Sequence, residues 1–163
     1  MRAMERGVSN VRAKLSQGCL NLPTRQFEKI FTPAEANELI PRLEILIREA
    51  QTLARGLRGE IEQLVNIDPP ARELSIEKLI KRYPRLRQPA ARLAEVAQKI
   101  ESHGCLLKDI DQGLIDFPGE IDDDRVVFLC WQIGEPAVAA WHPIGEGFTQ
   151  RQPLPGARKP YLN

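Results

Sequence analysis

The side chains best suited to chemistry lie in the C-terminal part of the sequence, between residues 101 and 151. This segment contains both histidines, both tryptophans, two of the three cysteines and ten of the 22 acidic residues. Thiolate, imidazole and carboxylate groups are ligands that zinc and iron take from proteins. We therefore expect a metal or small-ligand site, if the protein has one, to lie in this segment.

Cys130 and His142 are predicted to lie close together on one face of a β-hairpin. If residues 134–136 form a three-residue loop, Phe128 faces His142 and Cys130 faces Ala140 on the neighbouring strand. Cys130 is then diagonal to His142, within reach for joint ligation of zinc or iron. A carboxylate would complete the ligand set, and the candidates are Asp116, Glu135 and Glu146.

Two alternatives to this ligand set remain open. His103 and Cys105 lie at a predicted helix-to-strand junction and would join Cys130 and His142 in a zinc site with two cysteines and two histidines. That spacing is not the spacing of a known zinc finger. In the simpler alternative no metal is bound, Cys130 is a small buried apolar residue, and His142 makes one structural hydrogen bond.

Asp116 stands between Ile115 and Phe117 in an apolar run, so its carboxylate is predicted to be buried. A buried carboxylate needs a charged partner, and Arg125 and Arg151 are the expected ones. A structural ion pair is the simplest role for this group, and acid–base chemistry at a shifted pKa is the alternative. For a metal-dependent hydrolase, the catalytic candidates are Asp116, Glu135 and His142.

Trp131 and Trp141 fall on one face of the same predicted hairpin. Apolar residues in this pattern are expected to pack on the helical part of the protein. The alternative is an aromatic ligand-binding cleft formed by the two tryptophans, with Arg151 at its rim.

The formal net charge of +1 results from blocks of opposite sign. Residues 101–148 have a net charge of −8, whereas residues 1–30 carry +4 and residues 149–163 carry +3. The acidic block opposes binding of a nucleic-acid backbone and favours cations, or a basic block of a second chain.

Six basic residues lie between positions 78 and 92. A solvated charged helix face is the simplest interpretation of such a run. RNA binding is the alternative, and the candidate contacts are Lys78, Arg82, Arg85 and Arg92.

The elements that must position these side chains begin with a long helix. Thr32, Pro33 and Glu35 form a helix-start pattern, with a capping box and a proline in the first turn. Apolar residues then recur every three or four positions as far as Val65. At 1.5 Å per residue such a helix is about 50 Å long, so it needs a partner helix.

After a turn at residues 66–70 the apolar stripe resumes and continues to about residue 103. Pro84 and Pro89 are expected to break this return arm, and Gly104 is expected to end it. The two arms are predicted to form an antiparallel hairpin over residues 32–103. Its apolar stripe is long enough to be shared between two chains, so self-association through the hairpin is a further hypothesis.

From residue 105 onward the apolar pattern changes from helical to alternating. Four strands are predicted at 105–110, 114–117, 125–133 and 137–144. Their short connections favour an antiparallel meander over residues 105–145. The predicted fold class is therefore α+β, a long antiparallel α-helical hairpin followed by a small four-stranded antiparallel β-meander.

The length predicts a single domain over residues 30–154, between a basic N-terminal extension (1–29) and a C-terminal tail (155–163). The longest apolar run, Val126–Trp131, is far too short to span a membrane. Neither a secretory signal pattern nor an even number of cysteines is present, which favours the cytoplasm.

Several short motifs follow one another in a characteristic order. They are Phe31–Asn37, Gly104–Asp109, Gly113–Pro118, Leu129–Trp131, Gly134–Pro136, Trp141–His142 and Gly147–Phe148 followed by Arg151. Over residues 30–154 the chain thereby resembles a bacterial family known as domain of unknown function 2203. The resemblance implies a soluble bacterial protein without an established activity, and it implies no catalytic residues.

The sequence as a whole predicts a small cytoplasmic binding or interaction protein that holds a divalent metal ion, zinc or iron, or a small ligand on its C-terminal sheet. A metal-dependent hydrolase at the same place and an RNA-binding protein are the alternatives.

Overall fold

The longest element is helix α2 (Pro33–Ile67), which begins at the predicted helix-start pattern of Thr32, Pro33 and Glu35. In the computed structural model, which describes residues 27–121 and 125–155, the Thr32 hydroxyl accepts the Glu35 backbone N–H, and the Glu35 carboxylate accepts the Thr32 N–H at 2.8 Å. This is the predicted capping box. The buried face of α2 consists of Ala36, Ile40, Leu43, Ile47, Ala50, Ala54, Leu57, Ile61, Leu64 and Val65.

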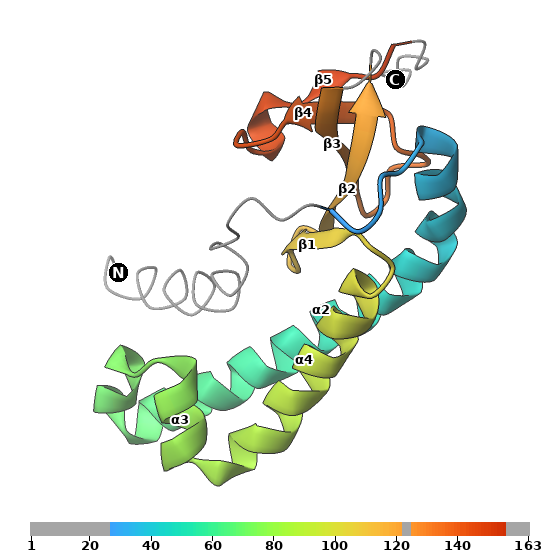
Figure 1. Cartoon of the computed structure of the whole chain (residues 1–163). Coiled ribbons are helices and arrows are strands. Elements are labelled where there is room, and N and C mark those ends of the chain that lie inside the picture. Colours follow the sequence, from blue (N-terminus) through green and yellow to red (C-terminus); the bar gives the residue numbers. More distant parts are fainter. Residues whose placement is uncertain (1–26, 122–124, 156–163) are drawn as a thin grey trace, which may run out of the picture.

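The return arm is built in pieces, as its prolines predict. It contains a 3₁₀ helix (Pro69–Glu73), helix α3 (Ile76–Arg82), a second 3₁₀ helix (Pro84–Leu86) and helix α4 (Arg87–Glu101), which packs along α2 (Figure 1). The predicted break at Pro84 is confirmed. The predicted break at Pro89 is wrong, because Pro89 lies in the first turn of α4, where no backbone N–H is needed for an intrahelical hydrogen bond.

Gly104 follows α4 with a φ of 90°, a left-handed conformation that suits the predicted stop. The chain then enters an antiparallel sheet of five strands in sequence order: β1 (Leu106–Asp109), β2 (Leu114–Ile121), β3 (Arg125–Gln132), β4 (Ala140–Pro143) and β5 (Gln152–Pro153). The prediction of four strands is therefore wrong by one. Strand β5 is only two residues long, too short for an alternating pattern to reveal it.

The hairpin of β3 and β4 keeps the predicted register although its loop is longer than expected. Phe128 pairs with His142 and Cys130 with Ala140. Strand β4 begins at Ala140 rather than at 137, because the backbone N–H of Val138 donates to the Asn37 side chain of α2 at 2.7 Å instead of to a strand.

The two faces of the sheet carry different residues. Leu129, Trp131 and Trp141 belong to the hydrophobic core that the sheet shares with the helical hairpin. Strand alternation places Asp116 and Cys130, with His142, on the opposite face.

The N-terminal segment of the described chain touches both faces of the sheet. Phe31 forms a parallel bridge with Gly119 beyond the end of β1, and its ring packs edge-on against Phe117 in the core. On the opposite face the ring of Phe27 packs edge-on against Phe128, with 5.5 Å between the ring centroids. The predicted extension at residues 1–29 and tail at 155–163 lie otherwise outside the described residues.

Asn37→Ala is expected to lower the free energy of unfolding by about 1–2 kcal/mol, because it leaves the Val138 N–H without its acceptor. Urea-induced unfolding measures the difference. Asn66→Ala, at the exposed far end of the same helix, is the matched control and is expected to change the stability by less than about 0.5 kcal/mol. Equal effects of the two substitutions would show that the Asn37 contact is not stabilising.

Among the described residues, no helix combines the length and the apolar composition that crossing a membrane requires.

Candidate metal centre

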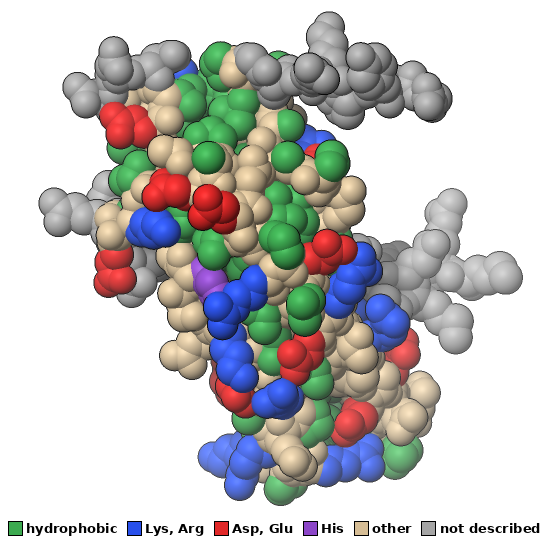
Figure 2. Space-filling view, turned by 90° about the vertical axis from the view of Figure 1, so that its right-hand side faces the viewer, with side chains coloured by type: hydrophobic (Ala, Val, Ile, Leu, Met, Phe, Trp, Pro, Cys, Tyr) green, Lys and Arg blue, Asp and Glu red, His purple; other side chains and the backbone are tan. Residues whose placement is uncertain are grey.

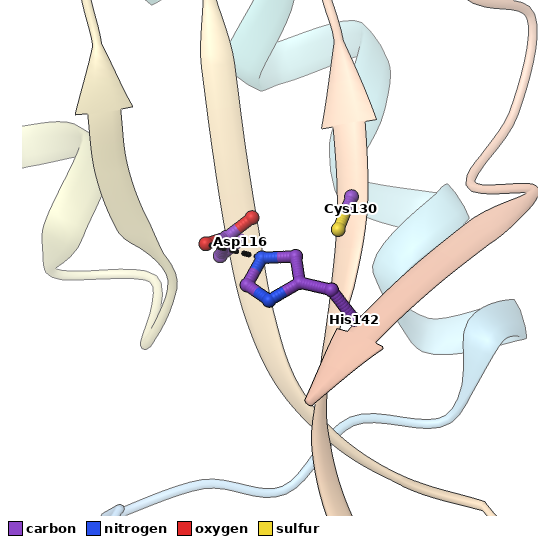
Figure 3. Close-up of side chains that lie close together, drawn as sticks. All are labelled: Asp116, Cys130 and His142. Carbon is purple, nitrogen blue, oxygen red and sulfur yellow. Dashed lines mark hydrogen bonds and ion pairs between the residues drawn. The ribbon is translucent and has the colours of Figure 1, made fainter. Parts of the chain in front are cut away.

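Asp116, Cys130 and His142 come from three neighbouring strands and meet on one face of the sheet (Figure 3). Asp116 of β2 is the direct partner of Cys130 of β3, and Phe128 pairs with His142 of β4, which makes His142 the diagonal neighbour of Cys130. One ligand atom from each residue lies within 4.8 Å of the other two. The relative exposures of the three residues are only 2%, 0% and 0%.

Both ring nitrogens of His142 face an acceptor. Nε2 lies 3.2 Å from Asp116 Oδ2, and Nδ1 lies 2.9 Å from the backbone oxygen of Pro143. The hydrogen bond to Asp116 raises the pKa of His142 above its ordinary value and outweighs burial, which acts in the opposite direction. When His142 is protonated, it and Asp116 form a buried ion pair.

Cys130 is a protonated thiol. Burial raises its pKa strongly, and the neighbouring negative charge of Asp116 adds to the effect. Its Sγ lies 3.6 Å from the backbone oxygen of Phe128.

The same three residue types also occur in catalytic triads with a cysteine nucleophile, but this geometry is different. In a triad the cysteine and the carboxylate use opposite nitrogens of the imidazole ring. Here Asp116 occupies Nε2, and Nδ1 is taken by the Pro143 carbonyl. A thiol of raised pKa is also a poor nucleophile, so the arrangement fits shared ligation better than covalent catalysis.

The charged partners predicted for Asp116 are wrong. Its carboxylate faces His142 and also Lys108, whose Nζ lies 3.7 Å from Oδ2. Arg151 pairs with Glu135 instead, at 2.7 Å, and Arg125 lies over the ring of Trp141. Lys108 was not among the predicted site residues. The only sequence feature that points to Lys108 is its place on the strand next to Asp116. An irregularity in β1 between Leu107 and Asp109 interrupts the inward–outward alternation of side chains, so the pattern does not show which face Lys108 is on.

The other predicted metal ligands lie outside this group of three. The Glu135 carboxylate accepts the Gln132 N–H at 2.9 Å as well as binding Arg151, and Glu146 is exposed. His103 and Cys105 hydrogen-bond to backbone oxygens at the end of α4, those of Lys99 and Ile100. The alternative site with two cysteines and two histidines is therefore not assembled in the described part of the chain.

Trp131 and Trp141 are buried in the core, with relative exposures of 0% and 7%. The indole N–H of Trp131 donates to the backbone oxygen of Glu135 at 2.9 Å. The predicted packing of this face on the hairpin is confirmed, and the rings do not line an open cleft.

The four basic RNA-contact candidates are exposed and lie on α3, the following 3₁₀ helix and α4. Arg82 pairs with Asp68, and Arg92 pairs with Glu49 and Glu95. On the face seen in Figure 2, Lys and Arg side chains lie among Asp and Glu side chains over the hairpin. RNA binding through Lys78, Arg82, Arg85 and Arg92 stays a prediction.

Comparison with known proteins gives one match. The family model for DUF2203, described as an uncharacterized conserved protein, matches residues 29–154. No curated protein and no solved structure matches the chain.

Proposed function

Since the chain belongs to the DUF2203 family of uncharacterised conserved proteins, we propose its function from its own side chains: it binds one divalent transition metal ion through Asp116, Cys130 and His142. Zinc is the first choice and iron(II) the second, because a thiolate, an imidazole and a carboxylate form a borderline-soft ligand set.

The observation that carries the proposal is the convergence of three different ligand types within 4.8 Å of one another. Zinc lies about 2.0–2.3 Å from each of its ligands, so ligand atoms around one ion lie roughly 3–4 Å apart. To share one ion the three atoms would move closer together by side-chain rotation, while the paired strands hold the backbones in place.

The surroundings of His142 support the same role. Metal-binding histidines usually donate the N–H that faces away from the metal to a carbonyl or carboxylate, which fixes the ring orientation. The contact between His142 Nδ1 and the Pro143 oxygen meets this requirement and leaves Nε2 for a metal beside Asp116 and Cys130. Three protein ligands leave a fourth position for a further ligand, as in catalytic rather than structural zinc sites.

Binding is better supported than the hydrolase alternative. The catalytic candidates for that alternative are Asp116, Glu135 and His142, but Glu135 is held by Arg151 and the Gln132 backbone. Among the described residues the Glu135 carboxylate makes no hydrogen bond or ion pair with Asp116 or His142, so it would have to leave both of its partners to activate a water.

Elemental analysis of the full chain, purified without a histidine tag, tests the proposal. We expect one equivalent of zinc or iron per chain, and equilibrium dialysis with zinc should reach the same ratio. Cys130→Ala and His142→Ala should each weaken zinc binding by more than about a hundredfold, since even the loss of an outer partner costs about 10- to 100-fold.

Cys105→Ala and His103→Ala are the matched controls. Cys105 is also buried, with a thiol pKa raised by burial to about 12, yet it lies outside the group of three. Both control variants should bind zinc as the unchanged chain does. Sub-stoichiometric binding by the folded chain at saturating zinc, or equal losses in variants and controls, would overturn the proposal.

A further inference from the structure

We propose that the fourth position on the metal takes a small anion, and that Lys108 holds this anion. This inference rests on the proposed metal site and names the class of ligand that the loaded site would recognise. Lys108 is not a metal ligand in this arrangement; it is a positioning residue beside the ion.

Lys108 lies where it can reach a ligand on the metal. Its Nζ is 3.7 Å from Asp116 Oδ2, the same oxygen that faces His142 Nε2. The Lys108 side chain is 39% exposed, whereas those of Asp116 and His142 are 3% and 1% exposed. Lys108 therefore connects the buried ligand group with the solvent.

The charge balance of the loaded site favours an anion. A divalent ion is neutralised by the carboxylate of Asp116 and the thiolate of Cys130, and His142 binds a metal as the neutral ring. The ammonium group of Lys108, which is partly exposed and lies 3.7 Å from Asp116 Oδ2, then leaves one positive charge beside the site. An anion on the metal balances this charge, whether it is a small external anion or the hydroxide formed from bound water; a neutral water molecule does not.

Aromatic rings cover one side of the site. The Phe128 ring lies 5.5 Å from the His142 ring and 5.5 Å from the Phe27 ring, measured between centroids. Lys108 Nζ lies 5.4 Å from the same Phe128 ring. Phe128 lies against His142, so the partly exposed Lys108 side chain marks the side from which a ligand would approach.

The test uses the full chain loaded with cobalt(II) in place of zinc and azide as the small anion. The charge-transfer band between thiolate and cobalt reports metal binding at Cys130, and the visible bands report ligand exchange at the metal. We expect a saturable change of the visible bands on addition of azide. Lys108→Met should weaken azide binding by about tenfold or more, whereas Lys108→Arg should largely preserve it.

Lys78→Met is the matched control, because it removes the same charge on α3, at the opposite end of the hairpin from the sheet (Figure 1). Its azide affinity should equal that of the unchanged chain. Absence of the charge-transfer band would refute the metal site itself. A normal band with no response to azide, or an equal response in the Lys108→Met variant, would refute the anion site alone.

Discussion

The affinity for zinc is expected to increase with pH, about a hundredfold per pH unit below the pKa of His142 and about tenfold per pH unit above it. Metal binding must displace the proton of the Cys130 thiol, whose pKa is raised, throughout the range from about pH 5 to pH 8. Below the pKa of His142 it must displace a second proton from the imidazolium. Because that pKa is raised, the change of slope lies above pH 6.5.

Competition with a chelator of known protonation behaviour measures this dependence. The stability of the metal-free protein supplies an internal control, because it is expected to depend on pH in the opposite direction. The raised pKa of His142 means that its ion pair with Asp116 stabilises the fold fully below the unfolded-state pKa and loses this effect as the pH rises through the folded-state pKa. Zinc affinity should therefore rise over the same range in which the metal-free fold loses stability. A zinc affinity independent of pH would contradict the protonation states assigned to the site.

Gly113→Ala is expected to lower the free energy of unfolding by about 3 kcal/mol, because the added methyl group meets both a left-handed backbone and a crowded neighbour. Gly113 has a φ of 62°, which costs an alanine about 1 kcal/mol or more. An added Cβ would also lie 2.5 Å from Ile133 Cγ2 and 2.8 Å from Ile133 Cβ. The β-branched side chain of Ile133 has little freedom to move away.

The control is the same substitution in helix α2. Gly56 lies in the helix interior with nothing within 4 Å of an added Cβ, so Gly56→Ala should raise the stability by about 1 kcal/mol. Urea-induced unfolding of both variants gives the two values. Effects of the same sign would contradict the assignment of Gly113 to a crowded left-handed turn.

The helical part of the fold was largely predictable because its signals are local. The capping box at Thr32 and the apolar stripe of α2 depend only on neighbours in sequence. The predicted break at Pro89 is wrong because helix α4 begins two residues earlier, at Arg87. Whether a proline breaks a helix or stands in its first turn depends on where the preceding 3₁₀ helix ends, and packing decides that.

The candidate site was predictable in part for the same reason. A short hairpin loop sets the pairing of β3 with β4, so the diagonal placement of Cys130 and His142 could be foreseen. The sequence pattern does not determine the register of β2, since it predicts that the strand ends at Phe117, whereas the strand extends to Ile121. Only the register of the complete β2 strand identifies Asp116, rather than Glu135 or Glu146, as the carboxylate in the group.

The origin of the three ligands in three successive strands has a consequence for folding. A slip of one residue in either ladder would turn a ligand to the opposite face of the sheet. A metal ion bound by all three side chains would therefore favour the correctly paired sheet over every shifted arrangement. The ion would bind tightly only to the correctly paired sheet, and its binding free energy would therefore stabilise that strand register over the others.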